Sequence, residues 1–121
     1  MPSTLESGSM AEQLAAEYLA GAGYGIMHRN WRFCHKEIDI VAEKNNTLII
    51  VEVKSRTSRD VSAEDLLSDR KLKCIVDAAE DYIEQYQITK EVQFDIIIVT
   101  FDGGSADIEH IENAFIPGVN W

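Results

Sequence analysis

Residues 37–54, EIDIVAEKNNTLIIVEVK, contain the pattern that decides the fold. Two apolar, β-branched runs, 37–43 and 47–54, flank Asn45 and Asn46, and asparagine tolerates the left-handed backbone of a tight hairpin turn. The segment therefore predicts an antiparallel β-hairpin. Because side chains alternate along a strand, one face should be a core stripe made of Ile38, Ile40, Ala42, Ile49, Val51 and Val53.

The other face of this hairpin is expected to carry charge at the end far from the turn. A two-residue turn would place Asp39 opposite Glu52, and Glu37 opposite Lys54. Like charges directly opposite each other destabilise a sheet, so a Mg²⁺ or Mn²⁺ ion between Asp39 and Glu52 would explain the pair. A polar, solvent-facing hairpin end with two ordinary salt bridges explains it too, and a one-residue slip would turn one strand's set away.

A bound divalent ion activates water and stabilises charge on a phosphorane. Lys54 follows Glu52 by two residues and therefore reaches the same volume. Its ammonium is expected to orient the attacking water or to neutralise the transition state. The pattern Asp39, Glu52 and Lys54 thus predicts a site that cleaves phosphodiester bonds.

The rest of the chain predicts helices on both sides of this hairpin. Apolar spacing indicates helices over about 10–21 and from Leu72 to Tyr86, and 24–33 reads as a strand. The continuous apolar run 94–101 is typical of a strand buried on both faces. Residues 55–69 read as a loop with a short helical turn capped at Ser62, and 108–115 as a last short strand or an irregular tail.

This order predicts an α/β single domain. Its mixed central sheet, a three-strand meander plus a parallel crossover strand, should be flanked by helices. We expect the domain to span 10–116, between a disordered lead-in at 1–9 and a tail at 117–121. Asp95, at the mouth of the buried strand, is expected to be a structural hydrogen-bonding acid.

The net charge is −10 over 121 residues, which argues against avid, non-specific binding to nucleic acid. From residue 76 onward there are ten acidic residues and one basic residue, Lys90, whereas residues 1–75 hold eleven acidic and ten basic residues. A polyanion would therefore meet the first part of the chain. No apolar stretch approaches the length of a membrane span, and neither a signal peptide nor a disulfide framework is evident. We expect a cytoplasmic protein without a membrane partner.

Basic residues at the start of the long helix, Lys71 among them, oppose the helix dipole. That mismatch suggests phosphate binding near the site, although solvated surface charges would give the same composition. The candidate contacts to nucleic acid are Arg29, Arg32, Arg56 and Lys71.

Several motifs in a fixed order resemble a known family. They are AEQLAAEYL (11–19), GYGIMHRNWR (23–32), EIDIVA (37–42), VEVKSR (51–56), QFDIII (93–98) and HIENAF (110–115). Together they resemble the YraN-like family of uncharacterised bacterial proteins. The EIDIVA and VEVKSR pair resembles the PD-(D/E)XK nuclease signature, and the fold that the resemblance implies is restriction-endonuclease-like and similar to Holliday-junction resolvases.

The resemblance implies a Mg²⁺-dependent endonuclease site. Asp39 and Glu52 match its metal-binding acids and Lys54 its lysine. Glu12, in the first helix, matches the acid that related resolvases bring to the metal, and an exposed helix acid is the alternative. Glu37 matches a motif acid that would support the ligands or pair with the lysine.

The chain departs from the family at three positions. Lys36 and Ala11 stand where glycine is usual, and Gln93 stands where arginine is common before Phe-Asp. These departures bear on substrate contacts more than on the metal ligands.

Three functions remain open. The first is an endonuclease acting on branched or structured DNA. The second is a non-catalytic module binding nucleic acid or protein, and the third is an interaction protein using its acidic C-terminal half. Resolvase-like proteins often act as homodimers, and the sequence identifies no interface for one.

Overall fold

The hairpin turn at Asn45 and Asn46 has the expected left-handed backbone, with φ of 52° and 60°, as a type I′ turn requires. It joins β2 (Lys36–Lys44) to β3 (Thr47–Arg56). The two strands are antiparallel, and Ile40 lies opposite Val51. The predicted register is therefore confirmed as far as that pair.

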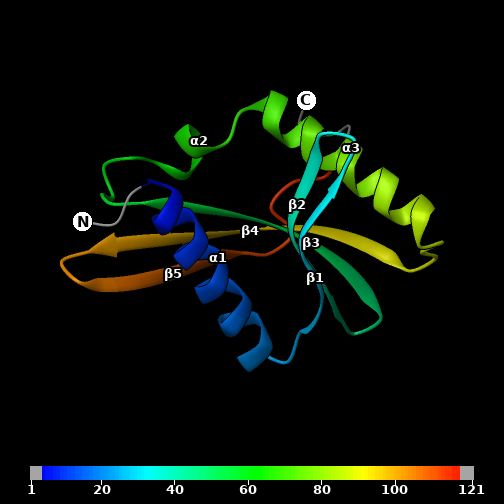
Figure 1. Cartoon of the computed structure of the whole chain (residues 1–121), viewed down its shortest axis with the longest axis horizontal. Helices are drawn as coiled ribbons and strands as arrows, with labels where there is room; N and C mark the ends of the chain where they lie inside the picture. Colours follow the sequence, from blue (N-terminus) through cyan, green and yellow to red (C-terminus); the bar gives the residue numbers. More distant parts are fainter. Residues whose placement is uncertain (1–3, 118–121) are drawn as a thin grey trace.

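The computed structural model describes residues 4–117. The remaining elements are α1 (Thr4–Gly21), β1 (Gly25–Phe33), α2 (Ala63–Leu66), α3 (Asp69–Gln85), β4 (Glu91–Asp102) and β5 (Ser105–Ile111). The sheet order is β1-β2-β3-β4-β5, in which only the β3–β4 pair is parallel. The predicted mixed sheet and its crossover strand are confirmed (Figure 1).

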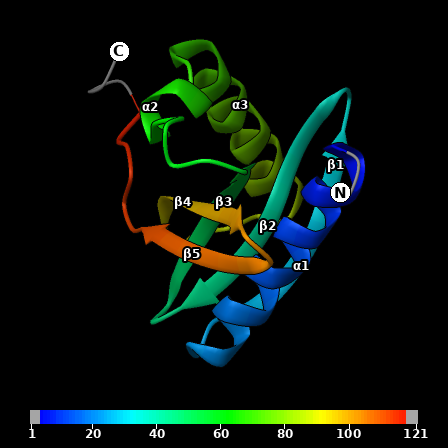
Figure 2. The ribbon, with the colours of Figure 1, turned by 90° about the vertical axis from the view of Figure 1, so that its left-hand side faces the viewer.

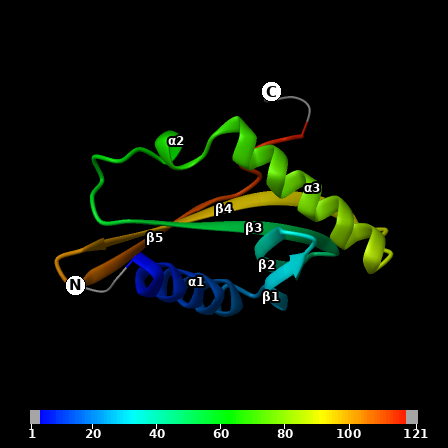
Figure 3. The same ribbon diagram turned by 45° about the horizontal axis from the view of Figure 1, so that its top comes forward.

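The helices lie on opposite faces of the sheet. α1 covers one face, and α3 with the short α2 covers the other (Figures 2 and 3). Beneath α3, Leu48, Ile50 and Ile98 pack with Tyr82, whereas the cluster beneath α1 includes Val51. Since β4 contributes to both clusters, its continuous apolar run follows from burial on both faces.

The structure defines the starts of all three helices more closely than the sequence does. α1 begins at Thr4, so residues 4–9 of the expected lead-in belong to the helix, while 1–3 and 118–121 lie outside the described residues. Ser62 caps α2 in a capping box, and the Ser68 side chain accepts a hydrogen bond from the Lys71 backbone at the start of α3. Within 4–117, none of the helices has the length and apolar content needed to span a bilayer.

One part of the expected core stripe is wrong. Ile38 packs in the cluster beneath α3, whereas Ile40 and Ala42 pack beneath α1, so β2 changes face at Asp39. The ladder between β2 and β3 also ends at Ile40 and Val51, although β2 stays paired with β1 down to Lys36. The β1–β2 ribbon thus leaves β3 at Asp39, and the site lies where they separate.

Candidate functional site

Asp39 and Glu52 lie together where the two strands separate. Asp39 Oδ2 accepts a hydrogen bond from the Val53 backbone amide at 2.8 Å, just beyond the last ladder pair. The Glu52 residue is 4% exposed. Burial, and then the adjacent Glu52 carboxylate, raise the pKa of Asp39 to about 8. In the protein without a metal ion, the Asp39 carboxyl is therefore mostly protonated at neutral pH.

Two lysines neutralise part of this negative charge. Lys54 Nζ lies 3.4 Å from Glu52 Oε2, and Lys71 Nζ lies 3.3 Å from the same oxygen. Burial opposes the charged form of Lys71, but the neighbouring carboxylates, Glu52 first, outweigh it and raise the Lys71 pKa. Lys54 comes from β3 and Lys71 from the first turns of α3. Glu52 thus brings Lys54 and the start of α3 together.

Glu12 reaches the same place from α1. Its Oε1 is buried and has no hydrogen-bond partner within residues 4–117. Burial raises the pKa of Glu12, although the charge of Arg29 acts to lower it. Charge from Glu52 adds to the rise. An acceptor oxygen that is buried and unsatisfied costs free energy, about 1–3 kcal/mol, so this position favours a cation or a donor.

These side chains share one pocket of about 680 Å³. Its lining residues come from helices α1 and α3 and from strands β1, β2 and β3: Gly8, Ser9, Glu12, Asn30, Arg32, Glu37, Asp39, Glu52, Val53, Lys54 and Lys71. Within residues 4–117, no group of three His, Cys, Asp or Glu side chains is close enough to hold an ion as it stands. Mg²⁺ usually takes only one or two carboxylates plus water and substrate phosphate. The Asp39–Glu52 pair therefore fits such an ion, with Glu12 as the acid that would have to move.

Comparison with known proteins identifies the family. Residues 11–99 match the model described as uncharacterised protein family UPF0102. The chain belongs to the UPF0102 family. A UPF0102 protein of Bacteroides fragilis is 47% identical over 111 residues, covering 91% of this chain and 92% of that protein. Those of Bacteroides thetaiotaomicron and Flavobacterium psychrophilum are 45% and 41% identical, covering 93% and 89% of this chain and 93% and 92% of those proteins. The YraN-like resemblance is thereby confirmed, and the UPF0102 match spans every acid of the pocket.

The expected Glu37–Lys54 pair does not form. Glu37 lies opposite Arg32 in the β1–β2 ladder and pairs with it at 3.4 Å. Lys54 pairs with Glu52. The prediction is wrong because it extended the β2–β3 register past Asp39, where β2 no longer pairs with β3.

The four candidate nucleic-acid contacts fall into two groups. Lys71 and Arg32 line the pocket. Arg29 is exposed on β1, and its charge acts on Glu12 of the pocket. Arg56 is different, because its guanidinium donates to Thr100 Oγ1 at 2.9 Å and to the Val61 carbonyl. Only 9% of its side chain is exposed. Arg56 therefore fastens the loop after β3 to β4 and has little surface left for a ligand.

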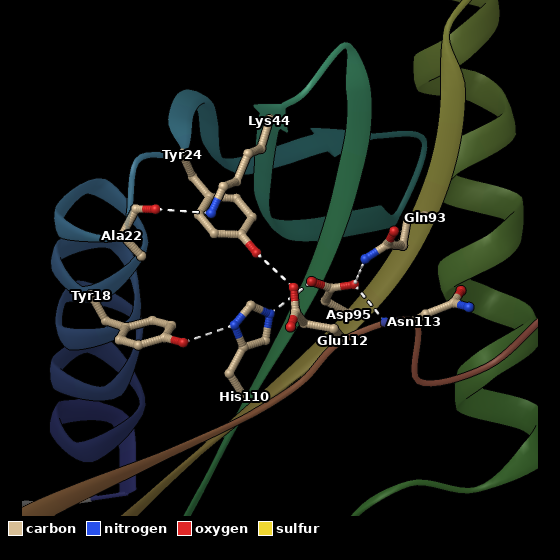
Figure 4. Close-up of polar contacts among 9 residues, drawn as sticks. All are labelled: Tyr18, Ala22, Tyr24, Lys44, Gln93, Asp95, His110, Glu112 and Asn113. Carbon is tan, nitrogen blue, oxygen red and sulfur yellow. Dashed lines mark hydrogen bonds and ion pairs between the residues drawn. The ribbon is translucent and has the colours of Figure 1, made fainter.

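A polar network connects Tyr18 of α1 to the buried acid Asp95 in the sheet (Figure 4). Asp95 Oδ2 lies 2.7 Å from His110 Nε2, and His110 Nδ1 lies 3.0 Å from Tyr18 Oη on α1. The Asn113 backbone amide and the Gln93 side chain donate to Asp95 Oδ1. The structural role expected for Asp95 is confirmed, since it ties β4, β5 and α1 together.

Sequence reasoning missed Asn30, which also lines the pocket. Its φ is 52° inside strand β1. The surrounding aromatic and alternating pattern predicts an ordinary strand, so no local signal marks the position.

Proposed function

We propose that this protein is a divalent-metal-dependent endonuclease that hydrolyses phosphodiester bonds of DNA, with a preference for branched or otherwise structured substrates. The observation that carries the proposal is the Asp39–Glu52 pair in the pocket, with Lys54 and Lys71 against it and the unsatisfied Glu12 oxygen beside it. Glu52 is buried and Asp39 is half-buried, and two such acids side by side are costly unless a cation lies between them. A surface that only binds a partner does not require two adjacent acids of this kind.

The roles follow from the chemistry of the side chains. Asp39 and Glu52 would hold Mg²⁺ or Mn²⁺, and Glu12 would join them. Such an ion, when bound, supplies an activated water and neutralises charge on the phosphate. Lys54 is already placed at the acid pair, and its ammonium would stabilise negative charge that develops on the substrate oxygens.

Lys71 would bind the phosphate backbone of the substrate. It lies at the start of α3, so the backbone amides of the first helical turn add favourable positive potential at the same end. The net charge of −10 limits non-specific binding to DNA. A narrow range of structured substrates, recognised by shape as well as charge, is consistent with that balance.

A second candidate is a non-catalytic module that binds nucleic acid or protein. One observation favours it, because both lysines already form ion pairs with Glu52. The acid pair is therefore partly neutralised from within the chain.

Two measurements separate these functions. Calorimetry should detect Mn²⁺ binding to the wild type, and Asp39→Asn should abolish it. Branched, flapped and linear DNAs are then incubated with protein and Mn²⁺, with chelator and the exposed-acid variant Asp102→Asn as controls. Cleavage that requires Asp39 supports the enzyme. Binding of DNA without cleavage supports the module, and a wild type that binds no Mn²⁺ even with DNA present refutes the enzyme.

A further inference from the structure

The backbone of Asn30 is unusual for its place in the fold. Among residues 4–117, seven non-glycine residues have positive φ, and all except Asn30 lie outside the strands, at turns. Asn30 lies inside β1 with φ of 52°. Asparagine is one of the few residues that enter this region at modest cost, and glycine enters it more easily. The position therefore holds a side chain where glycine would be the easier choice.

Asn30 lies directly across the ribbon from Asp39. In the β1–β2 ladder, Arg29 pairs with Ile40 and Trp31 pairs with Ile38, which leaves Asn30 opposite Asp39. Asp39 is also where β2 changes face. The left-handed residue and the change of face thus form one bend in two paired strands, and this bend carries the ribbon away from β3.

The Asn30 side chain also stands apart chemically from its neighbours in the pocket. The cationic donors there already have partners. Lys54 and Lys71 form ion pairs with Glu52, and Arg32 forms an ion pair with Glu37 on the neighbouring strand. The Asn30 side chain is exposed, and within the described residues its amide has no hydrogen-bond partner. A neutral amide can donate to a phosphate oxygen without adding to the ion pairs around it.

We propose that Asn30 is a further substrate-binding residue of this site, whose side-chain amide donates to a non-bridging oxygen of the phosphodiester held at Asp39 and Glu52. This inference rests on the proposed function. It also gives the substrate a path, because β1 is an edge strand and Arg29 and Arg32 flank Asn30 on it. The nucleic-acid backbone would approach over this edge, with Asn30 at the entrance to the pocket.

The competing explanation is that Asn30 serves only the bend. Asn30→Gly separates the two, because glycine keeps the left-handed backbone and removes the amide. The matched control is Asn46→Gly, which makes the same change at φ of 60° in the β2–β3 turn, at the opposite end of the hairpin. For each protein the melting temperature, Mn²⁺ affinity by calorimetry, affinity for branched DNA in Ca²⁺, and cleavage rate in Mn²⁺ are measured.

We expect Asn30→Gly to melt no lower than the wild type and to bind Mn²⁺ with unchanged affinity. Its DNA affinity or its cleavage rate should fall roughly ten- to a hundredfold, the effect of losing one hydrogen bond to a charged group. Asn46→Gly should match the wild type, and Asn30→Asp, which adds a negative charge in place of the donor, should fall at least as far as the glycine variant.

Each other outcome overturns the inference. If Asn30→Gly binds and cleaves DNA like the wild type, Asn30 serves only the bend, and the endonuclease proposal stands. If its Mn²⁺ affinity falls with its activity, the residue acts on the metal and not on the phosphate. If the wild type neither binds nor cleaves any DNA tested, the proposed function fails and takes this inference with it.

Discussion

Replacing Asp39 by asparagine should make the metal-free protein more stable at neutral pH. In the folded protein, burial and Glu52 raise the pKa of Asp39 from 3.8 to about 8. An acid whose pKa is higher in the folded state lowers stability as pH rises: the cost is absent below about pH 4, grows through neutral pH and levels off above about pH 8. Asparagine carries no charge at any of these pH values, so it removes the cost.

The size of the effect follows from the same pKa. Each tenfold change in proton affinity is worth about 1.36 kcal/mol, so keeping a proton on Asp39 at pH 7 costs about 4 kcal/mol as an upper bound. Solvent at the mouth of the pocket weakens both causes, and we expect a gain of about 2–4 kcal/mol for Asp39→Asn. The amide oxygen can still accept the Val53 hydrogen bond, and the amide nitrogen can donate to Glu52.

The assay is urea unfolding followed by circular dichroism, in chelator, at pH 5, 7 and 8. The difference in the free energy of unfolding between variant and wild type should increase from pH 5 to pH 8. In thermal unfolding at pH 7, the melting temperature of the variant should be higher by on the order of 10 °C. Asp102→Asn, at the exposed end of β4, should change stability by less than about 0.5 kcal/mol. Mn²⁺ should raise the melting temperature of the wild type and leave that of Asp39→Asn unchanged. A variant no more stable than the wild type at pH 7, or a gap independent of pH, would show that the two acids are not in conflict.

Three further predictions concern the other groups around the site. Glu12→Gln should weaken Mn²⁺ binding about tenfold by calorimetry while leaving urea unfolding in chelator within about 1 kcal/mol of the wild type; unchanged Mn²⁺ affinity would remove Glu12 from the ligands. Lys71→Gln should lower the affinity for DNA and reduce the slope of log affinity against log salt concentration by about one. Lys73→Gln, which changes an exposed neighbour in α3, should lower the affinity and the slope by less; equal effects would indicate non-specific electrostatic attraction. Asp95→Asn should lower the free energy of unfolding by about 2–4 kcal/mol in urea, because it breaks the buried contact to His110; a loss below about 1 kcal/mol would show that the network does not hold the sheet and α1 together.

Much of the fold is legible in the sequence because it depends on short-range patterns. Asn45 and Asn46 specify a two-residue turn, and that turn sets the β2–β3 register. The apolar run of β4 and the cap at Ser62 are likewise local. The proximity of Asp39 and Glu52 could be predicted because the β2–β3 register is regular up to the adjacent pair, Ile40 and Val51.

The wrong predictions about the hairpin share one cause. Glu37, Lys54 and Ile38 were assigned by continuing a regular pattern through Asp39, and the strands separate there. The strands separate opposite Asn30, a residue of β1 with a left-handed backbone. The spacing of apolar residues in the sequence does not indicate that backbone conformation. Arg56 likewise has the composition of a phosphate contact, and only its packing against β4 gives it another role.

The sequence by itself determined the α/β order of this protein, its hairpin register and the identity of the acid pair, because turn chemistry and side-chain alternation act over a few residues. Only the tertiary structure decided which groups meet that pair. Glu12 and Lys71 arrive on helices from opposite faces of the sheet, and they can converge on Glu52 because the β1–β2 ribbon bends away from β3 and opens the sheet between those faces.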